Sequence, residues 1–269
     1  MVAASGATGT PAIRRIGLLT GGGDAPGLNA VIRAVVLAAA REGWEVTGIR
    51  DGFDGLLAPD RLGGGVCALT PDDVHGIAHL GGTILGSSVH ADPFHYPQPQ
   101  PDGSIAACDR SSDVLAQCAR LGLDALVAVG GDGTMAIADG LARQGLRVVG
   151  VPKTIDNDLD HTVATFGFDT AVAFATECID RLHSTAQSHR RIMVVETMGR
   201  YAGWIALHAG LAGGAHAILI PEIPFDLDPV ARVIAQRDRA GRQHSIVVVA
   251  EGACPIDGTR ALQAAGAAG

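Results

Sequence analysis

The 269-residue chain has few aromatic residues and little positive charge, and each shortage excludes a class of protein. Phe, Trp and Tyr together make up 4% of the sequence, so the core must be aliphatic, and hydrophobic residues at 47% supply enough of it. Lys and Arg number 20 against 28 Asp and Glu, which gives a formal net charge of −8. That sign disfavours a general nucleic-acid surface, because such a surface needs clustered cations to displace the counterions of phosphates.

The sequence also lacks paired cysteines and long uncharged hydrophobic runs. Its five cysteines are scattered without a CxxC pair, which favours free thiols in a reducing compartment over a disulfide scaffold. The stretch 1–11 is small and polar, unlike a signal peptide. The longest hydrophobic run, 31–40, contains Arg33 and falls short of the roughly 20 residues of a membrane helix. We therefore expect a soluble cytoplasmic protein.

Glycine, in contrast, is abundant, at 37 residues. Short β-branched runs alternate with longer amphipathic segments, which predicts βαβ units, a mostly parallel sheet and an α/β fold. The expected strands are 13–20, 44–50, 82–85, 124–129, 146–151, 191–196, 215–220 and 245–250. The expected helices are 28–42, 71–80, 111–121, 135–144, 168–189, 201–211 and 229–239, with a Pro-rich loop over 94–104 and no clear element in the tail 258–269. Ligands of such sheets bind beyond the carboxyl ends of the strands, so the residues after each strand are the candidates for function.

Two glycine-rich turns between a strand and a helix predict a site for phosphates. The first, 20–27, is TGGGDAPG, and the second, 130–134, is GGDGT. Glycine lets backbone N–H groups approach a phosphate, and the N-terminus of the following helix favours the anion. Asp132 lies inside the second turn, where a carboxylate suits a Mg²⁺ ion that also takes phosphate oxygens. The plainer alternatives are a tight turn for the first and a helix cap for Asp132.

The segment 152–158, PKTIDND, places two carboxylates after the next strand. On an extended backbone Asp156 and Asp158 point the same way, so one can accept a proton while the other supports metal or water. Phosphoryl transfer to an alcohol needs such a base, and cations that spread the charge. A solvated acidic loop is the alternative.

Arginines and a glutamate flank the last strands. Arg191 precedes one strand, Arg200 follows it, and Glu251 follows the final strand. Guanidinium groups match phosphate oxygens, and a glutamate at a strand end can bind sugar hydroxyls. Surface ion pairs are the alternative explanation.

Together these motifs resemble the 6-phosphofructokinases. The matching segments, between about Ile13 and Glu251, are GGGDAPGLNAVIR, LGGTILGSS, VGGDGT, VPKTIDNDL and SHRRIMVVETMGRYAGW. The resemblance implies two similar Rossmann-like layered domains, a phosphoryl-donor domain for ATP and Mg²⁺ over 13–167 and a sugar-phosphate domain over 168–269 that looks incomplete at its C-terminus. It also implies a homotetramer or dimer that phosphorylates the C1 hydroxyl of fructose 6-phosphate in glycolysis.

The resemblance assigns roles to single residues. Asp156 would take the proton of the C1 hydroxyl, and Thr154 would lie at the transferring phosphoryl group. Asp158 would support the metal region, and Arg200 would be a further catalytic residue. The donor-binding residues would be Gly22, Gly131, Asp132, Gly133, Thr134 and Lys153, with Asp132 on Mg²⁺. The sugar-phosphate site would contain Thr154, Ile155, Asp156, Met198, Gly199, Arg200 and Glu251, and Arg191 would reach it across a subunit boundary.

The donor and the activity have alternatives. Gly133 resembles the ATP-using members and Lys153 the pyrophosphate-using ones, and this mixture resembles the mixed-substrate group. ATP is favoured, because no carboxylate at position 133 repels its α-phosphate. Val89 stands where the family usually carries Arg, and loss of such a cation would reduce the rate by about 10²-fold or more. Val89 therefore supports the alternative of an impaired relative that binds nucleotide or a partner subunit, whereas TIDND and MGRYAG disfavour a kinase for NAD or lipids.

Overall fold

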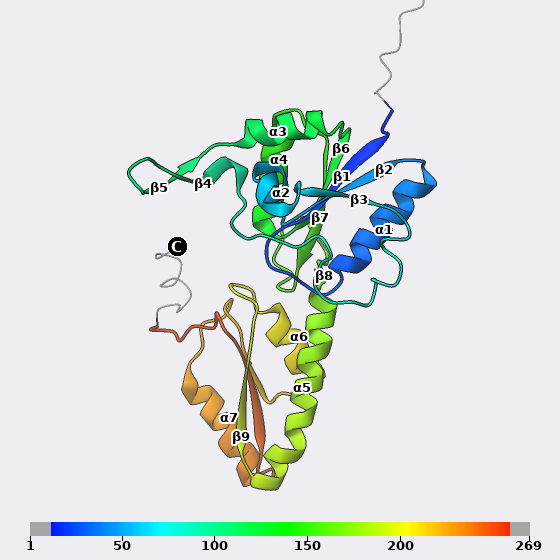
Figure 1. Cartoon of the computed structure of the whole chain (residues 1–269). Helices are drawn as coiled ribbons and strands as arrows, with labels where there is room; N and C mark the ends of the chain where they lie inside the picture. Colours follow the sequence, from blue (N-terminus) through cyan, green and yellow to red (C-terminus); the bar gives the residue numbers. More distant parts are fainter. Residues whose placement is uncertain (1–11, 259–269) are drawn as a thin grey trace, which may run out of the picture. The chain divides into compact units, whose positions relative to one another are not determined.

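The computed structural model describes residues 12–258, and the chain divides between Val151 and Pro152 into two compact units (Figure 1). The expected domain boundary between residues 167 and 168 lies later, at the start of α5 (Phe168–His189), and stays a prediction. Within the described part of the chain, no helix has the length and hydrophobicity needed to cross a membrane.

The larger sheet has six strands in the order β3-β2-β1-β6-β7-β8. They are β1 (Arg15–Thr20), β2 (Glu45–Ile49), β3 (Val66–Leu69), β6 (Ala125–Gly130), β7 (Val148–Thr154) and β8 (Phe166–Gly167). β1 pairs in parallel with both β2 and β6, so that Leu18 lies opposite Gly48 on one side and Val127 on the other. β3 runs antiparallel to β2. The mostly parallel sheet is thus confirmed, with β3 as an exception.

Helices α1 (Leu28–Arg41) and α4 (Asp132–Arg143) follow β1 and β6 and lie on opposite sides of this sheet (Figure 1). Right-handed crossovers require this, because β1 leads to β2 on one side of the strand order and β6 leads to β7 on the other. The core between the layers is aliphatic, as the scarcity of aromatics predicts. Leu18, Ile32 and Leu126 are fully buried, and each such side chain contributes roughly 1.5–3 kcal/mol to stability.

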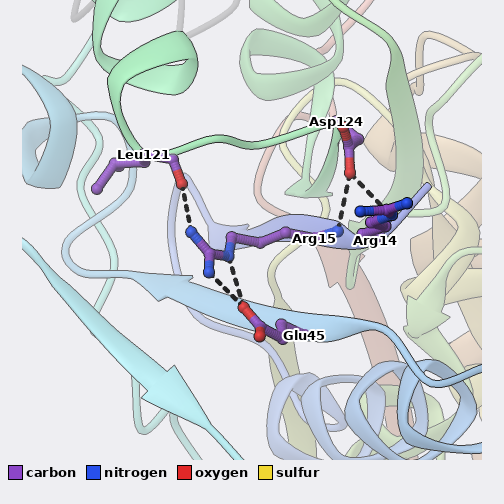
Figure 2. A network of polar contacts seen from close by, with 5 residues as sticks. All are labelled: Arg14, Arg15, Glu45, Leu121 and Asp124. Atoms are coloured by element: carbon purple, nitrogen blue, oxygen red, sulfur yellow. Dashed lines mark hydrogen bonds and ion pairs between the residues drawn. The ribbon is translucent and has the colours of Figure 1, made fainter. Parts of the chain in front are cut away.

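Figure 2 shows how the amino ends of three strands are aligned, at the edge of the sheet away from the glycine turns. The backbone N–H groups of Arg14 and Arg15 donate to Asp124 Oδ2 at 2.7 and 2.9 Å. The Arg15 guanidinium donates to the Leu121 carbonyl at 2.9 Å and to Glu45 Oε2 at 2.7 Å. The two backbone hydrogen bonds lower the pKa of Asp124. These contacts fix β1, β2 and β6 at one end, and their carboxyl ends are aligned as a consequence.

The second unit contains a three-stranded parallel sheet in the order β10-β11-β9. Its strands are β9 (Ile192–Thr197), β10 (Ala217–Leu219) and β11 (Ser245–Ala250), and its helices are α5, α6 (Trp204–Ala212) and α7 (Leu227–Arg239). Ile179 of α5, Ala206 and Ala209 of α6, and Ile246 and Val248 of β11 form its buried core.

Two expected elements are wrong. Residues 71–80 form turns and not a helix, because Gly76 adopts a φ of 74° and the Asp73 carboxylate accepts hydrogen bonds from the N–H and hydroxyl of Thr70. Residues 82–85 are also turns and not a strand, since Gly82 and Gly86 have φ values of 69° and 71°. Positive φ interrupts both regular structures.

The segment 94–104 is more ordered than the expected loop. It contains the end of a 3₁₀ turn, η2 (Pro93–His95), and the strand β4 (Tyr96–Pro99), which pairs with β5 (Ile105–Cys108). A two-stranded ribbon tolerates the prolines of β4 because an edge strand need not donate every N–H. The remaining elements of the first unit are α2 (Asp54–Leu57), η1 (Pro59–Leu62) and α3 (Ser111–Arg120). The expected tail without a clear element, 258–269, lies outside the described residues from residue 259 onward.

Candidate functional site

The two glycine turns follow adjacent strands at the point where the strand order reverses direction. β1 leads through α1 to β2, and its neighbour β6 leads through α4 to β7. Open α/β sheets bind ligands at such a switch point, beyond the carboxyl ends of the strands. The Gly21 N–H donates to the Val129 carbonyl at 2.8 Å, which ties the first turn to the end of β6. The two predicted phosphate-binding turns therefore lie side by side.

Both turns pack on the buried side chain of Thr134. A Cβ on Gly130 would lie 2.3 Å from Thr134 Oγ1, and a Cβ on Gly21 would lie 2.6 Å from it. Thr134 is 6% exposed and sits in the first turn of α4. Close packing against Thr134 thus requires glycine at positions 21 and 130.

A third loop, containing the LGSS motif of residues 85–88, closes on the first glycine turn. The Gly22 N–H donates to the Ser88 carbonyl at 3.0 Å, and Ser87 Oγ donates to the Gly22 carbonyl. Val89, the position at which the resemblance leads us to expect Arg, follows directly and is 67% exposed. The first glycine turn and this loop are therefore joined by backbone groups and a neutral hydroxyl.

Asp132 is the first residue of α4, so this helix begins earlier than the expected residue 135. The N-cap position is occupied by Gly131, so Asp132 is not the N-cap residue that the helix-cap alternative expects. Gly131 precedes it as N-cap, and Gly133 follows with open space where a Cβ would stand. The exposed carboxylate beside a helix N-terminus fits a Mg²⁺ ion that arrives with a polyphosphate, since Mg²⁺ takes one or two carboxylates and completes its shell with phosphate oxygens and water. Residues 12–258 contain no group of three or more His, Cys, Asp or Glu side chains arranged to hold a metal.

The PKTIDND segment begins as a strand and then bends. Lys153 and Thr154 complete β7, and Lys153 is only 4% exposed. Bends follow at Ile155 and Asp156, where the Asp156 N–H donates to Thr154 Oγ1 at 3.0 Å. Asp156 is half-buried. The sequence-based expectation of an extended backbone is therefore wrong from Ile155 onward.

Asn157 is the physical reason for this bend. It adopts a φ of 53°, and its Oδ1 accepts a hydrogen bond from the Thr165 N–H at 2.9 Å. Asparagine tolerates the left-handed region because its short side chain can satisfy local hydrogen bonds. The strand alternation that would point Asp156 and Asp158 the same way does not apply, and Asp158 is exposed.

In the second unit, the turn after β9 is held by hydrogen bonds to Glu251, which follows β11. Glu251 Oε1 accepts hydrogen bonds from the N–H groups of Gly199 at 3.1 Å and Arg200 at 2.7 Å. Arg200 has a φ of 53°, a strained value for a residue with a side chain, and the charge-assisted bonds offset that strain. Met198 is 63% exposed. The structure thus brings together Met198, Gly199, Arg200 and Glu251.

A second glutamate at the same turn was missed by the sequence analysis. Glu222 Oε1, beyond β10, accepts a hydrogen bond from the Gly203 N–H at 2.8 Å. Gly203 is the N-cap of α6, so the two carboxylates hold both ends of the segment 199–203. The available signal was the position of Glu222 in a PEIP motif directly after a strand.

Arg191 lies elsewhere. It precedes β9, and its N–H donates to the Ala186 carbonyl at 2.9 Å at the end of α5. Met198, Gly199 and Arg200 follow the other end of β9. Arg191 is therefore separated along the strand from the turn held by Glu251.

Comparisons with known proteins agree with these features. A family model described as phosphofructokinase matches residues 15–266. The ATP-dependent 6-phosphofructokinase of Chloroflexus aurantiacus is 52% identical over 256 residues, which covers 95% of this chain and 70% of that protein.

Solved structures give the same result for the fold. The phosphofructokinase of Pichia pastoris in the T-state matches with a TM-score of 0.78 and 32% identity, over 91% of this chain and 26% of that chain. A pyrophosphate-dependent phosphofructokinase from Marinobacter aquaeolei matches with a TM-score of 0.74 and 24% identity, over 90% of this chain and 62% of that chain, a likeness of fold alone. The chain belongs to the phosphofructokinase family.

Proposed function

We propose that this protein is an ATP-dependent 6-phosphofructokinase, which transfers the γ-phosphoryl group of ATP to the C1 hydroxyl of fructose 6-phosphate in glycolysis. The observation that carries the proposal is the pair of glycine turns at the β1–β6 switch point, with the exposed carboxylate of Asp132 beside them. Backbone N–H groups bind the phosphates, and Asp132 holds Mg²⁺, which neutralises charge on the polyphosphate.

ATP is supported as the donor by Gly133 and by the relatives. No atom lies within 4 Å of a Cβ built on Gly133, so a donor larger than pyrophosphate meets no side chain there. The Chloroflexus relative, at 52% identity, is named as ATP-dependent. Gly22, Gly131, Gly133, Thr134 and Lys153 complete the donor site in this proposal.

For the transfer itself, the Asp156 carboxylate accepts the proton of the C1 hydroxyl as that oxygen attacks the γ-phosphorus, and ADP leaves. Thr154, whose hydroxyl accepts the Asp156 N–H, holds that residue in place. Asp158 and Arg200 support the metal and the transferred charge.

The sugar phosphate is bound by the remaining predicted residues. The sugar is contacted by Ile155, Met198, Gly199, Arg200 and Glu251. The Glu251 carboxylate accepts hydrogen bonds from the sugar hydroxyls. Arg191 serves the 6-phosphate site of a neighbouring subunit in a homo-oligomer, because it lies at the opposite end of β9 from that turn.

A coupled assay for fructose 1,6-bisphosphate tests the proposal, with Mg²⁺ and either ATP or pyrophosphate. We expect turnover with ATP, and a loss of about 10²–10⁴-fold in kcat for Asp156→Asn, because the amide cannot accept the proton. Asp160→Asn is the matched control, since Asp160 is an exposed carboxylate two residues beyond the PKTIDND segment and has no assigned role. Turnover with pyrophosphate but not with ATP would overturn the assignment of ATP as the phosphoryl donor. Folded protein without turnover would favour the impaired relative, with Val89 as the first position to change.

A further inference from the structure

The loop 80–88, which closes on the first glycine turn, is held by a buried amide. Asn29 is 2% exposed and lies in the first turn of α1. Its Nδ2 donates to the carbonyls of Leu80 at 3.1 Å and Gly81 at 3.2 Å, and its Oδ1 accepts from the Ile84 N–H at 2.9 Å. Both amide hydrogens are used, so one side chain fixes both ends of the segment 80–84 against α1.

A relay of hydroxyl groups holds the next part of the loop. Thr20, fully buried at the end of β1, donates to the Gly86 carbonyl at 2.6 Å. Its oxygen lies 2.9 Å from Thr83 Oγ1, which accepts from the Leu85 N–H at 3.2 Å. Because the single hydrogen of Thr20 goes to Gly86, Thr83 must donate to Thr20. Each group of the relay thus has one possible direction.

These two side chains flank the glycine turn that the loop closes on. Thr20 is the first residue of the turn and Asn29 follows its end, and the loop reaches Gly22 through Ser87 and Ser88. The loop contains no helix or strand and has positive φ at Gly82 and Gly86, so its own backbone does little to fix its shape. The brace formed by Thr20 and Asn29 therefore sets how the loop meets the turn.

We propose that Asn29 and Thr20 are positioning residues of the donor site, an inference that rests on the proposed function. They act through the loop 80–88, which they hold where Ser88 and Gly22 meet. Removing the brace loosens the loop and weakens binding of the nucleoside triphosphate, while the sugar-phosphate residues of the second unit are unchanged.

The test compares variants that remove or keep each contact. Thr20→Val keeps the shape but removes the hydroxyl, Thr20→Ser restores it, and Asn29→Leu removes the amide. Ser111→Ala is the matched control, because Ser111 is 4% exposed in the same unit and accepts a hydrogen bond from Gln144 Nε2 at 3.0 Å, away from the loop. For each variant we measure KM for ATP and for fructose 6-phosphate, the Kd of Mg-ATP by calorimetry, and amide hydrogen exchange of residues 80–88.

We expect Thr20→Val and Asn29→Leu to raise the KM and Kd for ATP at least tenfold, leave the KM for fructose 6-phosphate within twofold, and accelerate exchange in the loop. Thr20→Ser is expected to restore most of the affinity. Unchanged donor affinity, or a change equal to that of Ser111→Ala, would overturn the proposal. If the parent protein binds Mg-ATP without phosphorylating the sugar, the proposed function fails and the Kd values still decide the brace. If it binds no Mg-ATP, both fail.

Discussion

The two units hold their strand-end turns with different chemistry. In the first unit, backbone groups and neutral side chains join the turns after β1 and β6 and the loop 85–88, as in the bond from the Gly22 N–H to Ser88. In the second unit, the carboxylates of Glu251 and Glu222 hold the turn after β9. A polyphosphate carries several negative charges, and carboxylates used as anchors around it would repel it. A sugar offers hydroxyl donors, which a carboxylate attracts.

The units also differ in how completely their strands are covered. In the first, β1 is buried along almost its whole length. In the second, β9 exposes Ile192 by 53% and Val194 by 67%, and α7 has no buried residue. Strand β9 and helix α7 are therefore less completely buried than β1.

The strongest test of the glycine-based anchoring uses two glycines of one motif. Gly130→Ala places a methyl group against the buried Thr134 side chain and should destabilise the first unit by roughly 1–3 kcal/mol, with loss of ATP binding. Gly133→Ala meets open space in a helix, where alanine is favoured by up to about 1 kcal/mol. Urea unfolding and nucleotide titration measure both. Equal effects of the two substitutions would contradict the packing argument.

Glu251 and Glu222 should differ in how much each stabilises the turn, because Glu251 accepts hydrogen bonds from two N–H groups and Glu222 from one. Glu251→Ala leaves two N–H groups of the turn without their acceptor and should lower the free energy of unfolding by about 1–2 kcal/mol and raise the KM for fructose 6-phosphate. Glu222→Ala removes one such bond from an exposed side chain and should have the smaller effect. The two effects should not add, because both residues hold one turn, and a double-mutant cycle by chemical unfolding measures this coupling. If the two losses of unfolding free energy added fully, Glu251 and Glu222 would act independently, against this prediction.

The stability of the second unit should depend on pH. Burial, and then repulsion from Arg237, His244 and His183, lower the pKa of His216 below its ordinary value of 6.5. As the pH falls through 6.5, His216 binds a proton in the unfolded chain but stays neutral in the folded one. Stability is therefore greatest above that pH and falls below it.

The matched substitutions are His216→Asn, whose amide oxygen can still accept the Ile246 N–H, and His161→Asn at an exposed position. Unfolding at pH 7.5 and 5.5 should show a shallower dependence only for His216→Asn. An unchanged slope would assign the pH dependence to other groups. This effect should be smaller than those of the glycine and glutamate variants.

The smallest effect concerns thiol chemistry. Burial raises the pKa of Cys118 in the first unit to about 11, which reduces its thiolate at neutral pH about 10²-fold relative to an ordinary thiol. Cys178 in the second unit is half-buried. Iodoacetamide should therefore modify Cys178 well before Cys118, as peptide mass spectrometry would show, without a change in stability. Early modification of Cys118 would mean that the first unit opens readily.

Strong local patterns made much of the fold predictable. The boundaries of α5 and β11 match the expected ones, because long amphipathic and continuous β-branched segments are clear signals. The predictions of an α/β fold and of the phosphofructokinase family are confirmed. The helix expected at 71–80 failed, since one left-handed glycine outweighed a helical pattern.

The site was predictable only where its chemistry follows a motif. Asp132 and Glu251 come directly after strands, where the sheet itself brings ligand-binding residues together. Asn29 and Glu222 matter through hydrogen bonds to segments distant in sequence, and the sequence pattern does not encode those contacts. The bend at Asn157 similarly depends on a bond to Thr165.

The relay from Leu85 to Gly86 has a consequence for how this chain can evolve. Thr83 and Thr20 form a donor–acceptor pair, so each position constrains which residues the other can accept. Serine at either position preserves the order of the bonds. A hydrocarbon at position 20, in contrast, removes the donor to the Gly86 carbonyl and the acceptor of the Thr83 hydroxyl hydrogen. Substitutions at these two positions should therefore be tolerated jointly rather than independently.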